Sequence, residues 1–152
     1  MWYADILGIA DYAALKNIIV CIEMHGNWFN SGKKAVEILN KINHPHIKIN
    51  YDTGNVIFFN NTRPEEDINY ALPYLGIIHL KDSSGKFKDW DFPAIGDGNI
   101  DFDQIFSALK NYDGPISLEI EFNGDVQPLK KINTALVDSM NFLKKYGYHK
   151  FS

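Results

Sequence analysis

Four short apolar runs divide the chain, and each is rich in β-branched residues. They are Ile18–Met24, Ile47–Tyr51, Gly76–Leu80 and Pro115–Ile120. Runs of this length with few polar residues are typical of strands in a parallel sheet that is buried on both faces. The pattern therefore predicts four buried strands.

The segments between these runs carry apolar residues three and four positions apart, which is the period of a helix. Ser31 is the predicted N-cap of the segment that follows it, and Thr62 is the predicted cap of another helix, with Pro64 in its first turn. Asp101 or Asp103 is expected to cap a third helix. Two further helices are predicted at Ala4–Lys16 and Pro128–Tyr146.

The predicted order is one helix followed by four strand–helix pairs. Such alternation favours a parallel sheet that is covered by helices and joined by right-handed crossovers. No low-complexity stretch or linker interrupts residues 1–152, so we predict a single α/β domain.

Composition narrows the classes of function. The 152 residues are 45% hydrophobic and 14% aromatic, which fits a folded domain rather than a disordered chain. A net charge of −4 argues against nucleic acid as a partner, because phosphate binding relies on clustered Lys and Arg. The single cysteine excludes a disulfide framework, and no apolar run is long enough for a membrane span. Because the N-terminus has no basic leader, we expect a cytoplasmic protein.

Each predicted strand ends in polar residues that a buried strand would not normally carry. These residues are Glu23, His25, Asp52, His79, Lys81, Glu119 and Glu121. In parallel α/β folds the carboxyl ends of the strands meet at one edge, and ligands bind there. If the four strand ends offer Glu, Asp, His and Glu in turn, the resulting three carboxylates and one imidazole form a hard, oxygen-rich set that suits a divalent metal ion. A single acid at a strand end more often caps a helix, so the metal interpretation depends on the recurrence at all four ends.

These residues lie in motifs that resemble the sugar phosphate isomerase/epimerase superfamily, the xylose isomerase-like TIM barrels. The matching stretches are IVCIEMHG, INYDTGN, GIIHLKD, IGDGNIDF and YDGPISLEIE. The resemblance implies that a divalent ion (Mn²⁺, Mg²⁺ or Co²⁺, with Zn²⁺ as an alternative) is bound by four ligands. They are Glu23, Asp52, His79 and Glu119.

The same resemblance implies an isomerase or epimerase that acts on a small sugar, a sugar phosphate or a keto-sugar. Glu23 and Glu119 would be the acid/base pair, moving a proton beside the substrate carbonyl through a metal-stabilised cis-enediolate. The family spacing from the turn glycine Gly114 selects Glu119 as the ligand. Glu121 lies on the same face of the strand and stays the alternative.

Three further residues are predicted to contact the substrate. His25 follows the first metal glutamate, as in many relatives, with a surface histidine as the alternative interpretation. Asn55 stands where some ketose epimerases have a substrate-binding histidine. Lys81 faces the pocket if His79 does, and it would meet a carboxylate or phosphate of the substrate. A solvated lysine at the rim is the alternative.

The length of the chain conflicts with a complete barrel. An eight-stranded (β/α)₈ barrel takes about 250 residues, whereas four strands are predicted here. The resemblance makes them strands 5–8, a (β/α)₄ half-barrel that keeps all four ligands. We expect a fragment of a longer gene product, with a homodimer or a separate N-terminal half that completes the barrel as alternatives. Two other functions stay open: an inosose dehydratase-like lyase and a non-catalytic interaction module.

Overall fold

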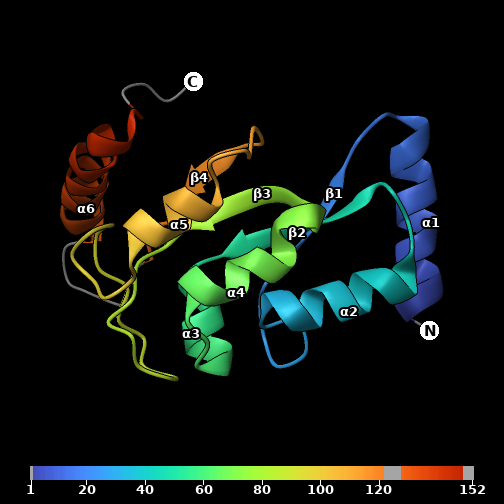
Figure 1. Cartoon of the computed structure of the whole chain (residues 1–152), viewed down its shortest axis with the longest axis horizontal. Helices are drawn as coiled ribbons and strands as arrows, with labels where there is room; N and C mark the ends of the chain where they lie inside the picture. The colour runs from blue at the N-terminus through green and yellow to red at the C-terminus, as the bar shows by residue number, and fades with distance from the viewer. Residues whose placement is uncertain (1, 122–127, 149–152) are drawn as a thin grey trace.

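The computed structural model describes residues 2–121 and 128–148 (Figure 1). Four parallel strands form one sheet in the order β1-β2-β3-β4. They are β1 Val20–Glu23, β2 Ile47–Asp52, β3 Leu75–Leu80 and β4 Ile116–Leu118. All four apolar runs are therefore strands and the predicted α/β class is confirmed, although β1 and β4 are shorter than their runs.

Helices alternate with the strands along the chain. They are α1 Trp2–Leu15, α2 Gly32–Ile42, α3 Asn55–Asn60, α4 Pro64–Ala71, α5 Phe102–Ala108 and α6 Pro128–Leu143, with 3₁₀ turns η1 Leu72–Tyr74 and η2 Lys144–Tyr146. In Figure 1, α2, α4 and α5 lie along one side of the sheet, while α1 and α6 stand at its opposite ends. This arrangement leaves the other side of the sheet for the polar strand-end residues.

Most helix starts follow the sequence signals. Ser31 caps α2 and Asp101 caps α5, each side chain accepting the backbone N–H three residues later, at 3.3 and 3.0 Å. The prediction that Thr62 caps α4 is wrong. Arg63 is the N-cap, because it is the last extended residue before Pro64, whose fixed φ suits the first helical position.

The short helix α3 was not predicted. It begins directly after β2, where Asp52 Oδ1 accepts the backbone N–H groups of Gly54 and Asn55 at 2.9 and 2.7 Å. The sequence Asp-Thr-Gly-Asn has the composition of a turn, which conceals a helix of six residues. The carboxylate at the end of β2 therefore also starts the next helix.

The helix-covered face of the sheet contains the core. Ile49 and Tyr51 on β2 are fully buried beneath the helices. The Tyr51 hydroxyl donates to Asp67 of α4 at 3.0 Å, and Asp67 also accepts the Gly32 N–H at the start of α2 at 2.5 Å. This buried carboxylate therefore joins two helices to the central strand.

The opposite face carries the alternate residues of each strand. Register pairs Glu23 with Asn50 and Asp52 with His79, so these four side chains project from the same face. Strands β1 and β4 each pair with a single neighbour among the described residues, and both edges of the sheet are therefore open.

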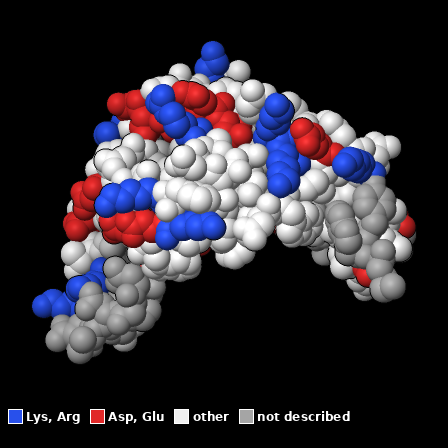
Figure 2. Space-filling view, turned by 90° about the horizontal axis from the view of Figure 1, so that it is seen from below, with Lys and Arg blue, Asp and Glu red and all other residues white. Residues whose placement is uncertain are grey.

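The outer surface has mixed charge. Figure 2 shows an arch-shaped molecule on whose visible face acidic and basic side chains are interspersed. Within residues 2–121 and 128–148, none of the helices has the length and apolar character needed to span a membrane.

Candidate metal centre

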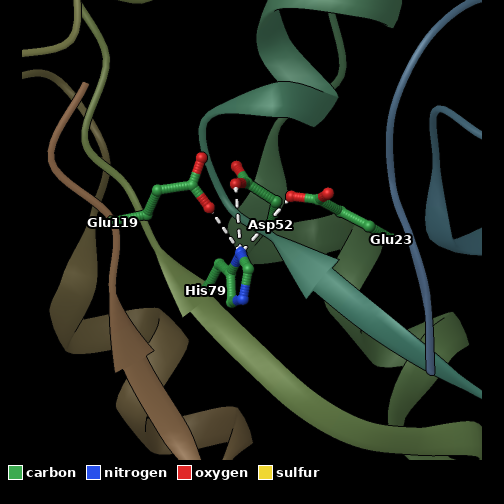
Figure 3. Close-up of side chains that lie close together, drawn as sticks. All are labelled: Glu23, Asp52, His79 and Glu119. Carbon is green, nitrogen blue, oxygen red and sulfur yellow. Dashed lines mark ion pairs between the residues drawn. The ribbon is translucent and has the colours of Figure 1, made fainter. Parts of the chain in front are cut away.

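Four side chains from four successive strand ends meet at one point (Figure 3). Each offers one ligand atom, and these atoms all lie within 4.8 Å of one another. The residues are Glu23, Asp52, His79 and Glu119. In Figure 3 the two glutamates approach the centre from opposite sides, with Asp52 between them. The structure thus brings together the four residues that were predicted to bind metal.

The His79 ring lies at the middle of this group. Its Nδ1 atom is 3.4 Å from Glu23 Oε1 and 4.0 Å from Asp52 Oδ2, and it forms an ion pair with Glu119 Oε2. Glu119 follows β4, and its backbone N–H bonds to Leu80 O at 2.9 Å. That bond extends the strand pairing by one residue, which fixes the direction of the Glu119 side chain.

Asp52 is the buried member of the group, with no exposed surface. Its Oδ1 accepts the N–H groups of Gly54 and Asn55 at the start of α3, while Oδ2 lies 3.3 Å from Lys81 Nζ. Burial raises the pKa of Asp52 from 3.8 to about 7. The nearby Glu119 adds to this rise, and Lys81 opposes it. This buried carboxylate lies beside an imidazole and two more carboxylates, and a cation would stabilise such a group of acidic side chains.

The partially exposed Glu119 has the opposite shift. The hydrogen bond from His79, followed by contacts with Lys81, lowers the pKa of Glu119 to about 2 despite its partial burial. The same hydrogen bond raises the pKa of His79, against the effect of burial. Glu119 is therefore an ionised base at neutral pH, and a metal ion would have to displace the proton of His79.

Asn50 is a buried neighbour of His79 that sequence reasoning missed. Its Nδ2 lies 3.1 Å from His79 Nε2, while its Oδ1 has no hydrogen-bond partner. Rotation of the amide by 180° would let Oδ1 accept from Nε2–H, which is the tautomer that leaves Nδ1 free for a cation. A polar residue inside an apolar strand, two positions before Asp52, was the available signal.

Lys81 does not lie at the rim. Its side chain is only 1% exposed, and Nζ lies 2.5 Å from Glu119 Oε1, 2.8 Å from Glu121 Oε1 and 3.3 Å from Asp52 Oδ2. The alternative of a solvated lysine is therefore wrong. Because Glu121 binds this ammonium, it lies outside the four-residue group that surrounds His79.

The other two predicted substrate residues differ in accessibility. His25 is exposed and its ring packs on Phe59, with 4.6 Å between the ring centroids. Asn55 is buried, donates to Met24 O at 2.9 Å and accepts from Lys81 Nζ at 3.1 Å. Contact with a substrate stays a prediction for His25, Asn55 and Lys81.

The donor set fits a divalent cation. Ligands on opposite sides of an ion with bonds of about 2.0–2.4 Å lie about 4–5 Å apart, which matches the 4.8 Å limit of this group. Three carboxylates and one imidazole are ligands that suit a divalent ion without a preference for sulfur.

Similarity to known proteins agrees with this architecture. The profile of the xylose isomerase-like TIM barrel family matches residues 1–146. The chain is 30% identical over 135 residues to the L-ribulose 3-epimerase of Methylomonas sp. (strain DH-1), covering 85% of this chain and 44% of that protein. It is also 30% identical over 128 residues to the ketose 3-epimerase of Arthrobacter globiformis, covering 79% of this chain and 41% of that protein.

The fold agrees with a solved structure as well. The crystal structure of D-allulose 3-epimerase from Methylomonas sp. in complex with D-allulose aligns with a TM-score of 0.73 at 25% identity, covering 94% of this chain and 53% of that one. The chain thus spans about half the length of the relatives it matches. With its alternating parallel α/β fold and a family match over residues 1–146, the chain belongs to the xylose isomerase-like TIM barrel family.

Proposed function

We propose that this chain carries the divalent-metal centre and the acid/base pair of a sugar isomerase or epimerase, with a ketose 3-epimerase as the preferred activity. The observation that carries the proposal is the convergence of four ligand atoms within 4.8 Å at the carboxyl ends of parallel strands. The names of two relatives, L-ribulose 3-epimerase and ketose 3-epimerase, support the same class of activity.

Epimerisation beside a carbonyl needs two groups that exchange a proton with opposite faces of one carbon. Glu23 and Glu119 approach the centre from opposite sides of His79, which suits this requirement (Figure 3). The hydrogen bond from His79 lowers the pKa of Glu119, so the carboxylate carries no proton at neutral pH and its acceptor oxygens are available, although the same shift makes it a weak base. A bound divalent ion would supply the positive charge that stabilises negative oxygens developing on the sugar.

The proposed substrate is a small carbohydrate. One solved relative is described in complex with D-allulose, a ketose. His25 is the accessible candidate for a contact with a sugar hydroxyl, since its ring is exposed and held against Phe59. The proton transfer would take place between the two glutamates, above the buried Asp52.

A further part of the proposal concerns closure of the barrel. The sheet has free edges at β1 and β4, and its relatives are about twice as long. A second (β/α)₄ half, from a second copy or from an N-terminal half, would cover both edges and exclude water from the site.

Two experiments test separate parts of the proposal: a metal titration tests the site, and a turnover assay tests the activity. Isothermal titration with Mn²⁺ should show one site per chain, and Glu23→Gln and Glu119→Gln should each weaken it. Conversion of D-fructose to D-allulose in the presence of Mn²⁺ then tests the activity. Absence of Mn²⁺ binding in the wild-type chain, or unchanged binding in both variants, would refute the metal centre. Product analysis separates epimerisation from loss of water by a lyase.

A further inference from the structure

Lys81 is a buried cation inside the candidate metal centre. Its Nζ has four oxygen neighbours, from Glu119 at 2.5 Å, Glu121 at 2.8 Å, Asn55 at 3.1 Å and Asp52 at 3.3 Å. An ammonium group has three N–H donors, so these protein oxygens occupy its full hydrogen-bonding capacity. A substrate anion would have to displace one of them to reach Lys81.

The backbone and the aliphatic part of the Lys81 side chain also make close contacts. The Thr53 hydroxyl accepts from the Lys81 N–H at 3.0 Å and donates to Lys81 O at 2.7 Å. A Cβ at Gly54 would lie 2.8 Å from Lys81 Cγ, so the side chain runs directly over a glycine. The Phe92 ring covers Nζ, whose distance from the ring centroid is 5.1 Å. The ammonium therefore has one available position.

Lys81 and His79 contact different oxygens of the Glu119 carboxylate. Oε1 contacts Lys81 Nζ, while Oε2 forms the ion pair with His79 Nδ1. A carboxylate anchored through one oxygen presents the other in a fixed direction. Glu121 binds the same ammonium and is thereby kept out of the group around His79.

The charge balance of the site also depends on Lys81. Four carboxyl groups lie close together here. His79 Nδ1 contacts Glu23, Asp52 and Glu119, and Lys81 Nζ contacts Asp52, Glu119 and Glu121. Like charges at this distance repel strongly in a partly buried site. Removal of the ammonium would leave Glu119 and Glu121 without the cation that contacts both of them.

We propose that Lys81 is a positioning residue, an internal cation that holds Glu119 and Asp52 in the geometry required by a divalent metal ion. This inference rests on the proposed metal centre and assigns Lys81 a role different from substrate binding. It also explains why Glu119, and not Glu121, supplies the ligand atom. Partners of this kind typically change metal affinity by about 10–100-fold when they are removed.

The test compares Mn²⁺ affinity in wild type, Lys81→Ala and Lys81→Met by isothermal titration at one pH and ionic strength. Both variants should bind Mn²⁺ about 10–100-fold more weakly. Lys81→Met keeps the apolar stem and serves as the second variant if Lys81→Ala does not fold. Lys110→Ala removes an exposed lysine at the end of α5 and should bind like wild type.

Chemical rescue separates a positioning cation from a general structural role. Added n-propylammonium can occupy the space left by Lys81→Ala, and it should restore most of the lost affinity, whereas n-propanol should not. Lys81→Met, which leaves no space for the amine, should not be rescued. Mn²⁺ binding by both Lys81 variants within about threefold of wild type overturns the inference, as does weakened binding by folded Lys81→Ala that the amine does not restore. A wild-type chain that fails to bind Mn²⁺ overturns the metal centre itself.

Discussion

Asp52→Asn should make the metal-free protein more stable while it weakens metal binding. Asp52 has no exposed surface, and its Oδ2 makes the longest of the four contacts of the Lys81 ammonium, at 3.3 Å. Asparagine keeps an Oδ1 that can cap α3 through the N–H groups of Gly54 and Asn55, so the local fold should persist. The substitution therefore removes a buried charge and little else.

The expected magnitude follows from the pKa of Asp52, which burial raises from 3.8 to about 7. A rise of about three units at 1.36 kcal/mol per unit corresponds to about 4 kcal/mol against the ionised form in the folded state. Because the pKa of Asp52 is raised in the folded state, the protonated carboxyl group favours folding. This contribution to the stability of the wild type is complete below pH 3.8 and is lost as the pH rises through about 7. The new amide would face the Lys81 ammonium, which offsets part of the gain, so we expect about 2 kcal/mol at pH 7.5.

Urea unfolding in EDTA at pH 7.5 and pH 4 measures this effect. Asp52→Asn should be the more stable protein at pH 7.5. The difference should shrink as the pH falls from about 7 towards 4, because Asp52 in the folded wild type takes up its proton near pH 7. Mn²⁺ at 100 times its Kd should stabilise wild type by about 2.7 kcal/mol and leave the variant almost unchanged. A variant that is equally or less stable than wild type at pH 7.5 without metal would contradict the buried-charge argument.

Further predictions concern the neighbours of Asp52. Glu119→Gln should weaken Mn²⁺ binding more than tenfold and Glu121→Gln less than tenfold in calorimetric titrations, whereas equal losses would make both residues ligands. Wild-type Mn²⁺ affinity should increase from pH 5.5 to 8, because the metal must displace a proton from His79, whose pKa is raised. Proton release measured in buffers of different ionisation enthalpy should accompany binding, and a flat pH profile would argue against His79 as a ligand. Asn50→Asp should retain Mn²⁺ affinity and Asn50→Leu should lose about 10–100-fold, with equal affinities counting against a role in orienting the ring. Asp67→Ala should lower the free energy of unfolding by about 1–3 kcal/mol in urea, because it removes the acceptor of the buried Gly32 N–H and one of the two acceptors of the Tyr51 hydroxyl.

Local sequence patterns predicted most of the fold. The four apolar runs became strands, and Ser31 caps its helix as expected. These features depend on residues a few positions apart, which is the range over which helix and strand periods act. Helix α3 was not predicted because it is short. Asp52, whose carboxylate accepts the N–H groups at the start of this helix, was assigned to a metal site only.

The side chains around the centre show where pattern reasoning ends. A lysine near a strand end is usually exposed, and no local signal distinguishes Lys81 from that majority. Its burial requires carboxylates from β2 and from the segment after β4, which are about 30–40 residues away in sequence. Likewise, Glu119 and Glu121 share a face, and their separate roles emerge only when Lys81 stands between them.

The sequence by itself determined that four strands would end in acids and a histidine at one edge of a parallel sheet, because alternation and chain order are local properties. Only the tertiary structure decided which of those side chains meet, which oxygen of Glu119 faces His79 and where Lys81 lies. Those outcomes depend on strand register and on burial, which bring charges from distant segments into a site where each must find a partner.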